Sequence, residues 1–103
     1  MAVFVEYVSY RADDIEEEKL MELRRQAILD VKAAHPALVD VPCVARLDDG
    51  SYTDVWIYAT QEAAETANAG AHDIPGFLAF VEHTTDTEIR AGAMLDGAAS
   101  PLD

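Results

Sequence analysis

Residues 48–64 read DDGSYTDVWIYATQEAA, and this stretch holds a turn, a strand and the start of a helix in succession. Asp48-Asp49-Gly50 is typical of a β-hairpin turn, because glycine readily adopts the positive φ that tight turns need. Residues 51–59 are rich in aromatic and β-branched side chains, which favours a strand. Thr60 can cap a helix that starts directly afterwards. The centre of the fold is therefore a strand with a hairpin before it and a helix after it.

Two further strands and a long helix are predicted on the N-terminal side of this stretch. Residues 3–10 and 41–47 have strand-forming composition. Between them, Asp13 and Glu16 have the spacing of a capping box, and an apolar stripe follows at steps of three and four residues. The stripe consists of Leu20, Leu23, Ala27, Val31 and Ala34. His35-Pro36 should end the helix, because a residue before proline avoids the helical conformation.

The C-terminal side supplies a second helical region and a last strand. The helix after Thr60 has an alanine-rich face and should end at Gly70. Asp73 can cap a short additional helix, and residues 87–95 are predicted to form the fourth strand. The order β-α-β-β-α-β is that of an α+β, ferredoxin-like arrangement, with a four-stranded antiparallel sheet and two helices on one face. We therefore predict one domain over residues 1–95 and a loose tail over residues 96–103.

Self-association is predicted from the second face of this sheet. The alternation along residues 3–10 and 51–59 gives that face a set of mostly apolar side chains. The set consists of Phe4, Val8, Tyr10, Trp56 and Tyr58, with Cys43 or Val44 from the preceding strand. Helices are expected to cover the opposite face, which would leave this set exposed in a single chain. Two facing sheets would bury it, which predicts a homodimeric α+β barrel. The alternative is a monomer with an open apolar sheet.

The composition limits the partners and the compartment. The 103-residue chain has 20 acidic and 7 basic residues, a formal charge of −13, which disfavours binding to nucleic acid or to an anionic membrane. No apolar run reaches the roughly 18 residues of a membrane span, and the first residues do not resemble a signal peptide. The single cysteine, Cys43, favours a reducing compartment, the cytoplasm. The three histidines have no metal-ligand spacing, so neither a metal nor a cofactor is predicted.

Two segments resemble the antibiotic biosynthesis monooxygenase-like proteins. Residues 49–64 are similar to the third strand and second-helix start of this family, with YATQEA at residues 58–63 in place of its Trp-centred signature. Residues 35–38, HPAL, are similar to the segment before its second strand. The resemblance covers the topology of residues 3–95 and implies a dimeric α+β barrel. It also implies relatives that are cofactor-free oxygenases of polyketide phenols or that degrade haem. Asp54 and Tyr58 stand where the quinone-forming oxygenases have Asn and Trp.

A candidate site follows from the polar side chains that stand among the aromatic ones. Cofactor-free oxygenation needs a dry pocket, an oriented ring and a group that removes a proton. The predicted catalytic residues are Asp54, Glu6 and His72. The predicted substrate-binding residues are Trp56, Tyr58, Tyr10 and Phe4. The two aromatic side chains on residues 51–59 can equally be packing residues.

The polar candidates have structural interpretations as well. Glu6 on an otherwise apolar face can be ion-paired with Arg46 or Arg90, since an unpaired buried carboxylate is unfavourable. Asp54 can lie exposed near a sheet end. His72 can face solvent beside the end of the second helix.

The sequence thus predicts a cofactor-independent monooxygenase, or a related small-molecule enzyme, acting on an aromatic or polyketide-like substrate. The alternative is a non-catalytic dimer that binds a small ligand, which the changed Asn and Trp positions favour. A haem-binding variant would use Trp56 and His72, but residues 1–40 contain no asparagine of the kind that the haem-degrading relatives use. A cavity bounded by Trp56, Tyr58, Asp54 and His72 would favour the enzyme.

Overall fold

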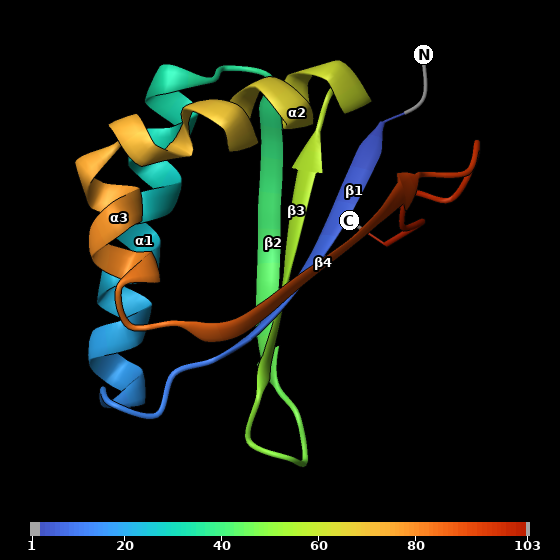
Figure 1. Ribbon diagram of the computed structural model, residues 1–103. Helices are drawn as coiled ribbons and strands as arrows, with labels where there is room; N and C mark the ends of the chain where they lie inside the picture. Colours follow the sequence, from blue (N-terminus) through green and yellow to red (C-terminus); the bar gives the residue numbers. More distant parts are fainter. Residues whose placement is uncertain (1–2, 103) are drawn as a thin grey trace.

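The computed structural model describes residues 3–102 and contains one four-stranded sheet with helices packed on it (Figure 1). The strands are β1 (Phe4–Arg11), β2 (Leu38–Arg46), β3 (Tyr52–Tyr58) and β4 (Thr85–Ala93). The helices are α1 (Glu17–Ala34), α2 (Gln61–Gly70) and α3 (Pro75–Val81), with a 3-10 turn at Ala71–Asp73. The predicted order of strands and helices is confirmed, including the short helix after residue 73.

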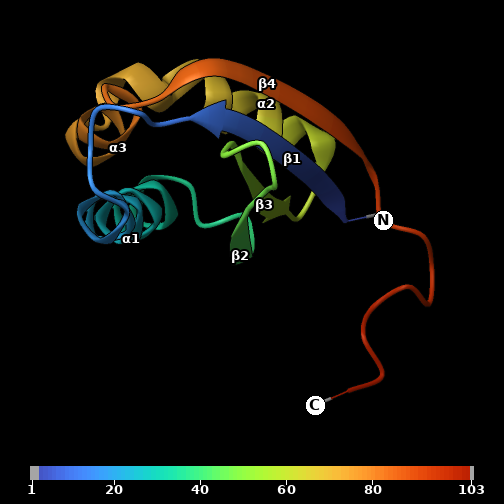
Figure 2. The same cartoon turned by 90° about the horizontal axis from the view of Figure 1, so that it is seen from below.

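The sheet is antiparallel throughout, with the strand order β2-β3-β1-β4. α1 and α3 lie side by side along the sheet, and α2 crosses near one end of β2 and β3 (Figure 1). Seen from below, the sheet curves, and the chain after β4 leaves the body of the protein (Figure 2). This is the ferredoxin-like α+β arrangement that the sequence predicts, with the short helix α3 in addition to the two main helices.

The start of α1 differs from the prediction. The helix begins at Glu17 with Glu16 at its N-cap, and no side chain caps it. The predicted cap, Asp13, instead accepts a hydrogen bond from Arg11 Nε at 3.3 Å. This ion pair holds Asp13 in the connection after β1, so the capping-box prediction was wrong. Two carboxylates in the first turn, Glu17 and Glu18, still complement the helix dipole.

The other boundary errors fall on β2, β4 and α3. β2 begins at Leu38 rather than at residue 41, because its pairing with β3 shifts register twice and passes Pro42 at the sheet edge. β4 begins at Thr85 rather than at residue 87. The N-cap of α3 is Ile74, and Asp73 closes the 3-10 turn instead of capping the helix.

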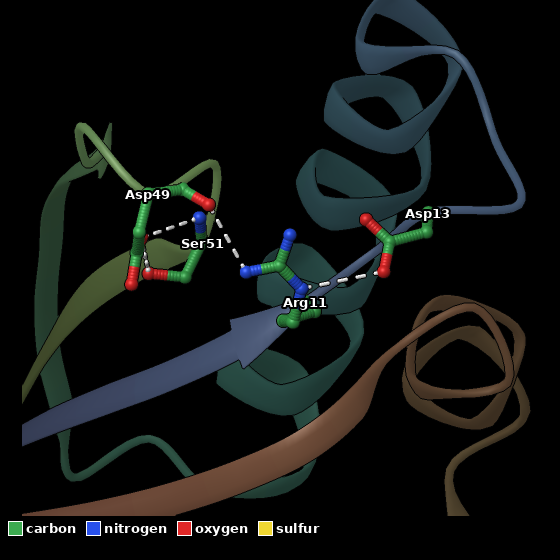
Figure 3. Close-up of polar contacts among 4 residues, drawn as sticks. All are labelled: Arg11, Asp13, Asp49 and Ser51. Carbon is green, nitrogen blue, oxygen red and sulfur yellow. Dashed lines mark hydrogen bonds and ion pairs between the residues drawn. The ribbon is translucent and has the colours of Figure 1, made fainter.

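The predicted turn between β2 and β3 is confirmed. Asp49 Oδ1 accepts from the backbone nitrogen and the hydroxyl of Ser51, at 2.9 and 2.6 Å (Figure 3). Arg11 Nη1 donates to the Asp49 carbonyl oxygen at 3.1 Å, which ties the turn to the end of β1. Gly50 has a φ of +85°, a conformation that L side chains rarely adopt.

The helix ends behave as the sequence predicts. Thr60 caps α2 by accepting from the backbone nitrogen of Ala63 at 3.0 Å. α2 ends at Gly70, and α1 ends at Ala34 with His35 as its C-cap. Within residues 3–102, no helix is both long and apolar enough to cross a membrane.

The face of the sheet that meets the helices is the opposite of the predicted one. The register places three pairs on one face, namely Phe4 with Tyr58, Glu6 with Trp56, and Val8 with Asp54. Trp56 and Tyr58 are buried in a core with Val31 of α1 and with Ala64 and Ala67 of α2. The set predicted to meet a second copy therefore lies in the core of a single chain.

The error has a physical cause, because both faces are mostly apolar and alternation alone does not rank them. The open face carries Val5, Tyr7, Val55 and Ile57, which pair across β1 and β3. Tyr7 is 49% exposed there. The partners of the two acidic residues on the inner face, Arg24 and Asn68, come from the helices themselves.

Candidate functional site

A cavity of about 390 Å³ lies between the inner face of the sheet and the helices. Small-molecule sites typically range from roughly 300 to 1,000 Å³. Its walls come from β1, β3 and β4 on one side and from α1, α2, the 3-10 turn and α3 on the other. The lining residues that matter for its chemistry are Glu6, Tyr10, Asp54, Trp56, Tyr58, Asn68, His72, Phe77 and Phe80. The cavity that the sequence analysis named as favouring an enzyme is therefore present.

Asp54 is fully buried and forms an ion pair with α1. Arg24 Nε donates to Asp54 Oδ2 and Arg24 Nη2 donates to Oδ1, both at 2.8 Å. The Tyr10 hydroxyl donates to the same Oδ2 at 3.1 Å. Such a bidentate contact between a guanidinium and a carboxylate is strong and fixes the orientation of both groups. Asp54 is therefore not exposed at a sheet end, and Arg24 balances its charge.

The two donors to Asp54 hold their protons firmly. Burial lowers the pKa of the Arg24 guanidinium, but the hydrogen bonds and the charge of Asp54 more than offset this and leave it raised. Burial, followed by the charge of Asp54, raises the pKa of the Tyr10 phenol well above its ordinary value. Arg24 thus stays charged and Tyr10 stays neutral through the neutral pH range.

Glu6 is the second buried carboxyl on this face, with 5% of its surface exposed. Asn68 Nδ2 of α2 donates to Glu6 Oε2 at 2.9 Å, and this is its one hydrogen bond to residues 3–102. Burial raises the pKa of Glu6, and the Asn68 hydrogen bond lowers it in part. The predicted ion pair was wrong, since Arg46 bonds Glu17 and Arg90 stands opposite Tyr7 on the other face.

Aromatic side chains form most of the cavity wall. Trp56 meets Phe77 edge to face, with ring centroids 6.3 Å apart. Tyr10 meets Phe80 in the same way at 5.7 Å. Burial, followed by the charge of Glu6, raises the pKa of the Tyr58 phenol.

Of the remaining predicted site residues, the structure places His72 at the cavity and Phe4 outside its lining. Phe4 packs beside the core cluster of Trp56 and Tyr58 and is not among the residues that line the cavity. His72 lies in the 3-10 turn, lines the cavity and is exposed, so it stands where the cavity opens to solvent. Among residues 3–102, no three His, Cys, Asp or Glu side chains gather in a way that could hold a metal ion.

Sequence reasoning missed Arg24 and Asn68, and a signal existed for both. Arg24 follows Leu20 by four residues and precedes Ala27 by three, so it lies within the apolar stripe of α1. Asn68 follows the buried Ala64 by four residues on α2. A polar side chain inside a buried stripe requires a buried partner, and the acidic residues of the sheet were the available ones.

Solved structures resemble this chain over almost its whole length. SnoaB, a cofactor-independent oxygenase from Streptomyces nogalater, aligns with a TM-score of 0.74 over 97% of this chain and 100% of its own, at 14% identity. A NIPSNAP family protein from Agrobacterium tumefaciens aligns with a TM-score of 0.65 over 99% and 92%, at 20% identity. A protein from Nitrosomonas europaea, provisionally described as an antibiotic biosynthesis monooxygenase, aligns with a TM-score of 0.69 over 95% of each chain, at 11% identity.

The likeness lies in the fold. No protein-family model and no curated protein matches the chain. Identities of 20% or less establish architecture but not chemistry. The chain has the fold of the antibiotic biosynthesis monooxygenase-like proteins.

Proposed function

We propose that this protein is a cofactor-independent monooxygenase, or a related small-molecule enzyme, that acts on an electron-rich aromatic substrate in the cavity. The observation that carries the proposal is the Glu6 carboxyl, which is buried among aromatic side chains and has one hydrogen bond within residues 3–102. A buried carboxyl with a raised pKa in a cavity is a candidate for acid–base chemistry. The description of SnoaB as a cofactor-independent oxygenase supports the reaction class.

In this proposal Glu6 is the general base. It removes a proton from the substrate, and the resulting anion supplies the electrons that reduce O₂. A carbon–oxygen bond forms at a CH₂ group of the substrate, which becomes a carbonyl, and the second oxygen atom leaves as water. Trp56 and Phe77 orient the ring, and the aromatic wall keeps water from the anion.

Asp54 has a different role in the proposal from the one first predicted. Its carboxylate oxygens are engaged by Arg24 and Tyr10, so it acts as a positioning residue and leaves proton removal to Glu6. His72 at the opening of the cavity is the second candidate catalytic residue in this proposal.

The test is oxygen consumption with anthrone and simple polycyclic phenols. Glu6→Gln should lower the rate at least about a hundredfold, in line with the loss of a general base. Glu18→Gln removes the same charge from an exposed position on α1 and should leave the rate unchanged. We would abandon the proposal if Glu6→Gln, His72→Ala and Asp54→Ala all consumed oxygen at the wild-type rate.

A non-catalytic ligand carrier is the second candidate. It is favoured by Asp54, which stands at the Asn position of the quinone-forming oxygenases and is bound to Arg24. A carrier would bind aromatic ligands in the cavity but consume no oxygen with any of them, whereas the enzyme would do both.

We also propose a homodimer, formed through the open face of the sheet. Tyr7, Val55 and Ile57 give that face its apolar character, and a second copy would cover them. Light scattering should give twice the 11.2 kDa of one chain, and Tyr7→Lys should shift the protein toward the single-chain mass. A wild-type protein that is monomeric at micromolar concentration would contradict this proposal.

A further inference from the structure

The charges around the cavity are unequally balanced, and this bears on which ligands it can accept. Asp54 is matched by Arg24, so the pair contributes little net charge. Glu6 has an amide partner, Asn68, and no cation partner among residues 3–102. Among the lining residues, His72 has the one basic side chain, and it is exposed at the opening of the cavity. The cavity interior therefore has an unmatched acidic group and no unmatched cation among the lining residues.

Glu6 also has a free acceptor position. Oε2 is occupied by Asn68, whereas no donor from residues 3–102 reaches Oε1. Within the same residues, every fully buried side-chain nitrogen or oxygen atom has a hydrogen-bond partner. Oε1 is thus reachable from the cavity, which Glu6 lines. A ligand hydroxyl could donate to it, but a ligand carboxylate would meet it as a like charge.

We propose that Glu6 makes the cavity selective for uncharged, hydroxyl-bearing aromatic ligands and excludes their carboxylate counterparts. This inference names the substrate class of the proposed function and rests on the same cavity. The selection works by repulsion as well as attraction, since a carboxylate entering a site with walls of low polarity has no cation to meet. The aromatic surfaces of Trp56 and Phe77 bind both kinds of ring equally and contribute no discrimination.

The test uses three probes with the same ring system, namely 2-naphthol, 2-methoxynaphthalene and 2-naphthoate. Binding is measured by calorimetry at pH 8 with the full chain. We expect 2-naphthol to bind at least about tenfold more tightly than 2-naphthoate, with 2-methoxynaphthalene between them, since it lacks the donor but carries no charge. Glu6→Gln should bring the affinities for 2-naphthol and 2-naphthoate within about threefold of each other.

Glu18→Gln is the matched control, because it removes one exposed negative charge from a residue that does not line the cavity and should keep the wild-type order of affinities. Equal affinity for 2-naphthol and 2-naphthoate in the wild type would overturn the inference. An unchanged ratio in a folded Glu6→Gln variant would do the same. Failure of the proposed function looks different: the binding order would hold while no oxygen is consumed. Oxygen consumption without the binding order would refute the selectivity alone.

Discussion

The Arg24–Asp54 ion pair allows a quantitative test of how this core is built. In Arg24→Met the side chain keeps its bulk, but Asp54 loses both 2.8 Å hydrogen bonds and keeps only the 3.1 Å bond from Tyr10. The Asp54 side chain is 1% exposed and that of Arg24 is 14% exposed, so the lost donors belong to a mostly buried pair. Removing one partner of a buried pair typically costs about 3–5 kcal/mol. A domain of this size is stable by only roughly 5–15 kcal/mol, so the loss should be large.

Urea unfolding measures this loss, with the fluorescence of Trp56, the single tryptophan, as the probe. Arg46→Met is the matched control, because its partner Glu17 is exposed and such pairs contribute little to stability. A triple variant, Arg24→Met with Asp54→Leu and Tyr10→Phe, leaves no polar group of the network unpaired. It should recover most of the loss. A loss below about 1 kcal/mol in Arg24→Met, as for an exposed pair, would refute this account of the core.

Three further predictions concern other parts of the chain. Burial raises the pKa of Glu6 in the folded state above its ordinary 4.5, so the folded protein holds that proton more tightly than the unfolded chain. Stability should therefore fall as pH rises from about 4.5 through the raised pKa. Urea midpoints from pH 4 to 8 should show this decline in the wild type and less of it in Glu6→Gln. Gly76→Ala would place a Cβ 2.0 Å from Asp30 Oδ2, so the Asp30 carboxylate must turn away; thermal unfolding should show a net loss of at most about 1 kcal/mol, which Asp30→Ala in the same chain should remove. Thr60→Ala removes the cap of α2 and should lower the urea-derived stability by about 1 kcal/mol, whereas Thr60→Ser should not.

The fold was predictable because its signals are local. The turn at Gly50, the cap at Thr60 and the stop before Pro36 each depend on a few neighbouring residues, and each lies where the sequence indicates. The prediction that the helix starts at Asp13 was wrong, because Arg11 binds the Asp13 carboxylate. Short-range patterns predict an element well until a side chain has a competing partner nearby.

The site was predictable in its residues but not in its geometry. Glu6, Asp54, Trp56 and Tyr58 were identified from alternation along two strands, and they share one face as expected. Which face the helices cover was not predictable, because both faces are apolar and the deciding contacts join residues far apart in sequence. Arg24 lies 30 positions from Asp54, and Asn68 lies 62 positions from Glu6.

The two acidic residues of the inner face differ in their partners, and this difference is why the proposal assigns proton removal to one of them. Asp54 and Glu6 both come from the middle of a strand and both are buried, so burial does not distinguish them. Their partners do, since a guanidinium and a phenol occupy Asp54, whereas a single amide reaches Glu6. A guanidinium satisfies the oxygens of Asp54 and fixes them in the core, whereas burial raises the pKa of Glu6 and its amide partner offsets this only in part. Burial of Glu6 without a cation partner among residues 3–102 disfavours its ionised form, and such an arrangement is expected where a group serves a ligand instead of the core.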